Sequence, residues 1–183
     1  MKRRILTVLL LIIALAAAVV LICSFGGRSR SRAFAAEEKA RKAEEALVYV
    51  YYADTYLSLD QNGIVCANNS SRPTALPEIT GIDFSSVSFG EKAQATESNA
   101  LEYVIRIALD LKKQDIRADK IAYENRMASI YIDRLEIQLG KNEKTDDKIN
   151  DLADFIDKLD GQAGTLFMQN GNANNYGYTF RAK

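Results

Sequence analysis

An uninterrupted apolar stretch near the N-terminus constrains this chain more than any other feature. Residues 5–23, ILTVLLLIIALAAAVVLIC, are nineteen consecutive uncharged residues, of which Thr7 is the only polar one. As a helix rising about 1.5 Å per residue, the stretch approaches the roughly 30 Å hydrocarbon thickness of a bilayer. Ser24 and Phe25 can lengthen it. We therefore predict a transmembrane helix over residues 5–25, with residues 1–4 in the cytoplasm and the remainder outside the cell membrane.

Three interpretations of this stretch compete. Its length favours an uncleaved signal anchor, because the apolar region of a cleaved signal peptide usually has about 7–15 residues. A cleavage site of the small-x-small form is present at residues 33–35, but three arginines separate it from the apolar run. A lipoprotein signal normally has a small residue before the cysteine, whereas Ile22 precedes Cys23 here. We therefore expect a single-pass anchor.

Charge is distributed unevenly along the chain. The sequence has 24 basic and 24 acidic residues, but six of the basic residues and none of the acidic ones fall within residues 1–32. The remainder therefore has a net charge of −6, which argues against nucleic-acid binding because that requires a basic surface.

The absence of histidine and the presence of only two cysteines, Cys23 and Cys66, exclude several common sites. These are Ser-His-Asp and Cys-His catalytic sites, histidine-ligated zinc sites and four-cysteine zinc sites, and we predict no metal, cofactor or small-molecule substrate.

Residues 26–46 predict a linker, because a short polar stretch is followed by AFAAEEKARKAEEA, a composition of high helix propensity. From residue 47 to 183 the pattern predicts one domain with a mixed or antiparallel sheet and two amphipathic helices. Together with the transmembrane helix, the predicted fold class is α+β. Asn62-Gly63 between apolar runs favours a type I′ hairpin turn. Strands are expected at 47–52, 56–59, 63–66, 120–123, 128–135, 137–140, 165–169 and 176–180, with a weaker extended segment at 82–89.

The two helices are predicted from apolar residues that recur every three or four positions. Five aspartates fall between the apolar positions of the second helix, where this spacing predicts a solvated face rather than a metal site. The core positions are Leu101, Val104, Ile105, Ala108 and Leu111 in helix 96–114, and Ile149, Leu152, Phe155, Ile156 and Leu159 in helix 146–159. The aspartates are Asp147, Asp151, Asp154, Asp157 and Asp160.

The order of these motifs resembles the extracytoplasmic β domain of the bacterial cell-division family FtsQ/DivIB. The similarity covers residues 47–183. It rests on LD…GIV at 59–65, LPEITG at 76–81, LEIQLG at 135–140 with Lys148 and the helix 149–159, GTLFM at 164–168 and YTFR at 178–181. The family normally has a second small domain, of the POTRA type, between the anchor and the β domain. Residues 26–46 are too few to form it.

The resemblance implies a non-enzymatic scaffold of the divisome at the division septum. In that family the β domain docks the outer segments of two single-pass proteins, FtsL and FtsB (DivIC in Gram-positive bacteria), and helps to regulate septal peptidoglycan synthesis. It implies that a partner segment adds as a strand beside the last strand of this domain. The partner-binding residues that it implies are Tyr176, Tyr178, Thr179, Phe180 and Arg181.

Two other classes of function remain open from the sequence. An extracytoplasmic sensor or small-ligand-binding module would need an apolar pocket with converging polar groups. A membrane-anchored, wall-modifying hydrolase would need paired carboxylates, for which Glu124, Asp133 and Glu136 are the nearest candidates.

Overall fold

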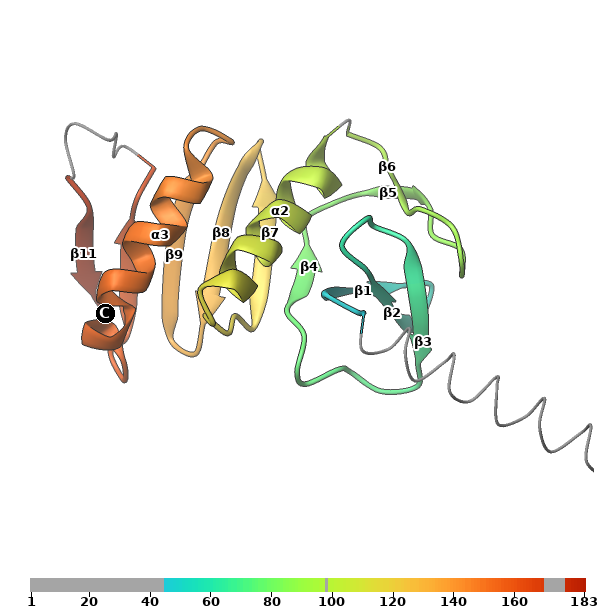
Figure 1. Ribbon diagram of the computed structural model, residues 1–183, viewed down its shortest axis with the longest axis horizontal. Coiled ribbons are helices and arrows are strands. Elements are labelled where there is room, and N and C mark those ends of the chain that lie inside the picture. The colour runs from blue at the N-terminus through green and yellow to red at the C-terminus, as the bar shows by residue number, and fades with distance from the viewer. Residues whose placement is uncertain (1–44, 98, 170–176) are drawn as a thin grey trace, which may run out of the picture. The chain divides into compact units, whose positions relative to one another are not determined.

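A mixed sheet of nine strands dominates the structure. The computed structural model describes residues 45–97, 99–169 and 177–183, which belong to one compact unit. The strands follow the order β11-β10-β9-β8-β7-β4-β1-β2-β3. Helices α2 (Ala100–Lys113) and α3 (Thr145–Phe155) lie on the same face of this sheet, and the 3₁₀ helix η1 (Ile156–Leu159) continues α3 (Figure 1).

The N-terminal part of the sheet is an antiparallel meander with one added parallel strand. The meander pairs β1 with β2 and β2 with β3, and β4 joins it by pairing parallel to β1 on one side and β7 on the other. The strands are β1 (Val48–Tyr52), β2 (Thr55–Leu59), β3 (Val65–Asn69) and β4 (Glu78–Thr80). A separate pair is formed by β5 (Phe84–Ser86) and β6 (Gln94–Ala95).

The C-terminal part of the sheet begins with three antiparallel strands and ends with a crossover. These strands are β7 (Lys120–Glu124), β8 (Met127–Ile132) and β9 (Leu135–Gly140). Helix α3 then connects β9 to β10 (Gly164–Phe167), and β10 pairs parallel to β9. The helix supplies the long connection that a parallel pair requires. The last strand, β11 (Thr179–Ala182), pairs antiparallel to β10.

The apolar stripe predicted for the first helix is confirmed. All five of its predicted core residues are buried. The helix ends at Lys113, and Asp115, two residues later, has a positive φ of 55°. In α3, Ile149 and Leu152 are completely buried, while Ile156 and Leu159 of η1 are partly buried. The side chain of Phe155 lies outside the described part of the structure.

The predicted fold class, α+β with an N-terminal transmembrane helix, is wrong for the part of the chain that the structure describes. That part is mostly sheet, with 39% strand and 22% helix. The reason is that the sheets include short strands whose sequences show little alternation of apolar and polar residues. β4 has three residues and lies between two parallel neighbours, and β5 and β6 are formed from the weak segment near 82–89 and residues after it.

The membrane-spanning segment predicted at 5–25 lies outside the described residues, as do residues 26–44 of the linker predicted at 26–46. Within residues 45–97, 99–169 and 177–183, no helix is both long and apolar enough to cross a membrane.

The predicted hairpin around Asn62-Gly63 is present, but its turn type is different. β2 and β3 pair antiparallel across this turn, and only Gly63 has a positive φ, of 77°. The backbone N–H groups of Asn62 and Ile64 both donate to Asp60 Oδ1, at 2.8 and 2.9 Å. The Asp60 side chain therefore shapes a longer loop than a two-residue type I′ turn.

The positive-φ pair expected of a type I′ turn occurs elsewhere. Ala53 and Asp54 connect β1 to β2, and Asn125 and Arg126 connect β7 to β8, all with φ between 48° and 63°. A further turn at Asp133 divides the predicted strand 128–135 into the end of β8 and the start of β9. Asp and Asn tolerate the left-handed backbone conformation better than most residues. Ala53 and Arg126 do not belong to these residue types, so the sequence does not predict a positive φ at either position.

A lysine is buried between α3 and the sheet. Lys148 is 4% exposed, and its Nζ donates a hydrogen bond of 2.7 Å to the carbonyl oxygen of Leu139. The nearby Tyr103 hydroxyl donates to the Gly140 carbonyl oxygen at 3.1 Å. Burial lowers the pKa of Lys148 below its ordinary 10.5, and the neighbouring Glu143 offsets part of that effect.

We predict that this lysine makes stability rise with pH. Between the lowered pKa of folded Lys148 and 10.5, the unfolded chain holds more protons than the folded one, so the free energy of unfolding increases with pH. Lys148→Met removes this dependence. Urea unfolding of both proteins between pH 7 and 10 should show wild type gaining stability relative to the variant. Parallel pH profiles would contradict the assignment. The range stops at pH 10 because burial raises the pKa of Tyr103, which has the opposite effect at higher pH.

Candidate partner-binding edge

The last strand forms one margin of the nine-stranded sheet. β11 pairs with β10 on one side, and no described strand pairs with its other side (Figure 1). The backbone bonds of this pair fix the direction of each peptide group. The Lys183 N–H donates to the carbonyl oxygen of Ala163, its partner in the register, at 2.9 Å. Because bonded pairs alternate along an antiparallel ladder, Arg181 and Thr179 also direct their N–H and C=O groups to β10.

The intervening residues therefore direct their backbone groups outward. Phe180 and Ala182 point their N–H and C=O groups away from β10, toward the open side of the sheet margin. Such a row of unpaired donors and acceptors is a template for another strand. The structure thus offers two outward residues whose donors and acceptors a partner backbone can use.

The side chains beside this margin differ on the two faces of the sheet. On the helix face, the Tyr178 hydroxyl donates a hydrogen bond of 2.6 Å to Asp151 Oδ2 of α3, and Phe180 packs against the core. On the opposite face, the Arg181 guanidinium carbon lies 5.1 Å from the centre of the Phe167 ring. Cation–π contact of this kind holds the guanidinium over the sheet while leaving the residue exposed.

The structure places four of the five predicted site residues together. Tyr178, Thr179, Phe180 and Arg181 lie in or next to β11, while Tyr176 lies outside the described residues. The strand begins at Thr179 rather than at the predicted position 176. Asp151 is a further neighbour of this margin that was not predicted, because nothing in the spacing of α3 indicates which strand it faces.

The opposite margin of the sheet is partly covered. In β3, the Val65 N–H donates to the Glu91 carbonyl oxygen at 3.0 Å, and the Val65 carbonyl oxygen accepts from the Gly90 N–H at 2.9 Å. The segment 88–92 thus occupies the start of β3. This contrast leaves β11 as the more accessible margin among the described strands.

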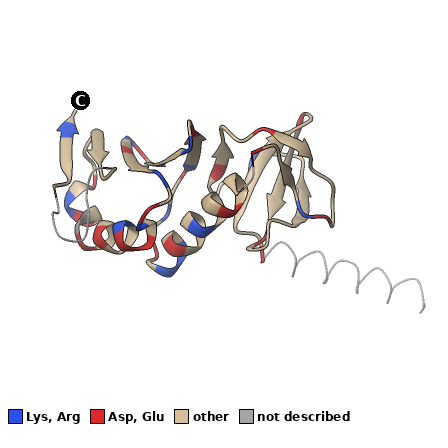
Figure 2. Cartoon of the chain, turned by 90° about the horizontal axis from the view of Figure 1, so that it is seen from above, with Lys and Arg blue, Asp and Glu red and all other residues tan. Residues whose placement is uncertain are grey.

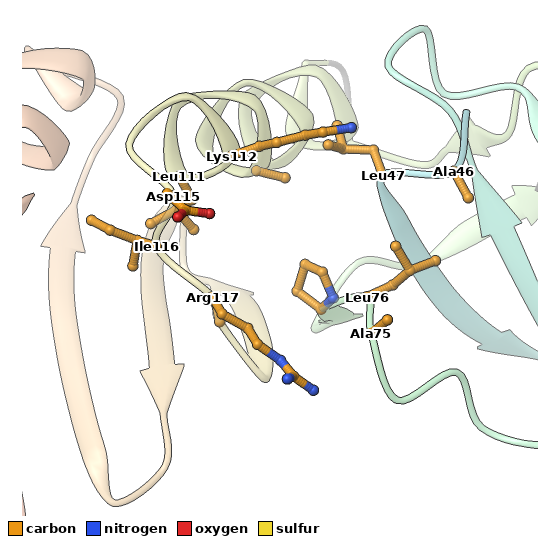
Figure 3. A pocket seen from close by; sticks show the side chains of 12 residues that line it. Ala46, Leu47, Ala75, Leu76, Leu111, Lys112, Asp115, Ile116 and Arg117 are labelled. Carbon is orange, nitrogen blue, oxygen red and sulfur yellow. The ribbon is translucent and has the colours of Figure 1, made fainter. Parts of the chain in front are cut away.

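A pocket near the start of β1 bears on the small-ligand hypothesis. It has a volume of about 230 Å³ and lies between the C-terminal end of α2 and residues 75–77 (Figure 3). Its polar side chains, Lys112, Asp115 and Arg117, are exposed, and the Arg117 guanidinium donates to the Thr74 carbonyl oxygen at 2.6 Å. These groups do not converge on a buried point, as those of a specific ligand site do.

The three carboxylates of the enzyme hypothesis are only partly brought together. Glu124 and Glu136 line a hollow of about 190 Å³ on the sheet face opposite the helices, beside Tyr131, whereas Asp133 lies in the β8–β9 turn. Burial, with a smaller effect of the two glutamates, raises the pKa of Tyr131. Glu136 already accepts hydrogen bonds from Gln138 at 2.9 Å and from Thr165 at 3.3 Å. This bonding suits a structural role on the sheet face.

Comparisons of the sequence with models of known protein families and with functionally characterised proteins returned no match.

Proposed function

We propose that this chain is a non-enzymatic docking protein that receives a segment of another protein as an added strand beside β11. The observation that supports this most directly is the row of outward backbone groups at Phe180 and Ala182. Strand addition uses such groups for affinity and alternate side chains for selectivity. Arg181 extends the site on the open face, where a guanidinium can bind a partner carboxylate with two hydrogen bonds.

We further propose that the chain acts in bacterial cell division, as its resemblance to the FtsQ/DivIB family implies. Motifs that carry the resemblance support it, because they fall in neighbouring strands of one sheet: residues 135–140 form β9, residues 164–167 form β10 and residues 179–181 lie in β11. The proposed partners are the outer segments of FtsB/DivIC-like and FtsL-like single-pass proteins. Through them the chain would help to regulate septal peptidoglycan synthesis.

The proposed location is the outer side of the cell membrane at the septum. The apolar segment 5–25 would tether the chain there, and residues 26–46 would separate the membrane from the sheet. Because those 21 residues are too few for a POTRA domain, the proposal places partner recruitment on the sheet margin alone. Fusing the C-terminus to a reporter that is active only outside the cytoplasm tests this placement. Activity of the reporter is the expected result. An inactive fusion, together with activity of a second fusion to a reporter that works only in the cytoplasm, would overturn the placement.

Co-purification tests the proposed function. The full chain, co-expressed with the host's FtsB/DivIC-like and FtsL-like proteins and extracted in mild detergent, should retain both. The matched control is Thr179→Pro. The Thr179 N–H is directed to β10, so proline there should unpair β11 and release the partners. Absence of both partners from the wild-type complex, or their full retention by a variant that has lost β11 pairing, would refute the proposal.

A further inference from the structure

The helix face beside β11 is lined by carboxylates. The hydrogen bond from Tyr178 to Asp151 shows that this flank of α3 is turned toward β11. Asp147 and Asp154 lie one helical turn before and after Asp151, so all three share the flank. Asp147 and Asp154 are exposed and Asp151 is half-buried. Figure 2 shows the resulting run of acidic residues along α3.

These three carboxylates are not neutralised within the described part of the chain. The ion pairs there involve Glu78, Glu97, Glu102, Asp110 and Asp133. Lys148 is on the same helix but is buried against Leu139. The exposed Lys144 and Lys158 lie near the two ends of this flank, and neither forms an ion pair with the three carboxylates among the described residues. The middle of the flank therefore presents three carboxylates without an ion pair among the described residues, beside a sheet margin that lacks a described neighbour.

A strand added to β11 would place half of its side chains next to this charge. It would lie about 4.8 Å beyond β11, with successive side chains on opposite faces of the sheet. The side chains on the helix face would be neighbours of Tyr178 and Phe180 and would lie along the α3 flank. Opposite charges within about 8–10 Å of one another attract at physiological salt, so positively charged side chains fit these positions.

We propose that the partner segment carries lysine or arginine at the alternate positions that face α3. This inference rests on the proposed function, because it assumes that β11 receives a strand. A second copy of β11 would be a poor occupant, since its side chains at these positions would be Tyr178, Phe180 and Ala182, none of which is positive. The charge complementarity therefore points to a different protein with an extended, alternately basic segment.

Three synthetic peptides of about eight residues test the inference. They alternate valine with lysine, with glutamate or with serine. Binding is measured by NMR with the full chain in micelles of a non-ionic detergent, where the amides of Phe180 and Ala182 report the site. We expect the lysine peptide to bind at least tenfold more tightly than the serine peptide, and the glutamate peptide to bind most weakly.

Two double variants that each lose two aspartates distinguish an effect of the carboxylates beside β11 from general attraction between a basic peptide and an acidic protein. Asp147→Asn with Asp154→Asn should remove most of the preference for lysine. Asp115→Asn with Asp146→Asn should keep it, because Asp115 follows α2 and Asp146 belongs to a different flank of α3. Equal binding of the lysine and serine peptides at β11 would overturn this inference and leave the proposed function standing. Failure of all three peptides to perturb the β11 amides would overturn both.

Discussion

Replacing Gly164 with valine is expected to detach β11 from the sheet and to weaken partner binding strongly. A Cβ atom at Gly164 would lie 2.4 Å from the Arg181 carbonyl oxygen and 2.7 Å from the Phe180 ring. The first of these is a backbone atom, so rotation of a side chain cannot relieve the clash. We expect the free energy of unfolding to fall by about 2–3 kcal/mol, as for other overpacked sites.

The effect on binding should equal or exceed the effect on stability. Displacing β11 removes the outward groups of Phe180 and Ala182 together, and we expect the dissociation constant for the FtsB/DivIC-like partner to rise roughly 100-fold or more, about 2.7 kcal/mol. Calorimetric titration and chemical denaturation measure the two quantities. Gly177→Val is the matched control, because no atom of the described residues lies within 4 Å of a Cβ at Gly177. Equal loss of binding in both variants would contradict the role of β11.

Replacing Ala182 with proline is expected to weaken binding without unfolding the strand. The Ala182 N–H points away from β10, so proline removes one outward donor and leaves the β10–β11 bonds in place. A partner carbonyl left without a donor costs about 1–3 kcal/mol, or roughly 5- to 150-fold in the dissociation constant. Titration of the partner measures this loss, while the midpoint of thermal unfolding should change little.

Ala182→Val is the control for that experiment, since it enlarges the side chain and keeps the N–H group. Thr179→Pro provides the contrast, because the inward N–H of Thr179 belongs to the ladder with β10 and its loss should lower stability as well as binding. An Ala182→Pro variant that binds as tightly as the valine variant would show that no partner backbone pairs with this position.

The helices could be predicted from the sequence because the spacing of their apolar residues is a local pattern. Residues such as Leu101 and Leu111 belong to one apolar stripe that pattern alone defines, and both are buried. The sheet was harder to predict. β4 is held by β1, which lies far earlier in the chain, and by β7, which lies far later, and its three residues carry no periodic pattern.

The candidate site was predictable in its location but not in its details. The aromatic alternation near the C-terminus indicated a final strand, and β11 lies there. The outward direction of Phe180 and Ala182 depends on the register with β10, which the sequence does not specify. The same is true of the approach of Asp151 to Tyr178, because it depends on how the crossover helix lies over the sheet.

Amide hydrogen exchange in β11 tests strand addition most directly. In the full chain alone, the amides of Thr179 and Arg181 should be protected by β10, while those of Phe180 and Ala182 should exchange freely. Addition of the outer segment of the host's FtsB/DivIC-like protein should slow exchange at Phe180 and Ala182 by roughly tenfold or more. A partner that binds tightly and leaves exchange at these two amides unchanged would contradict strand addition at β11.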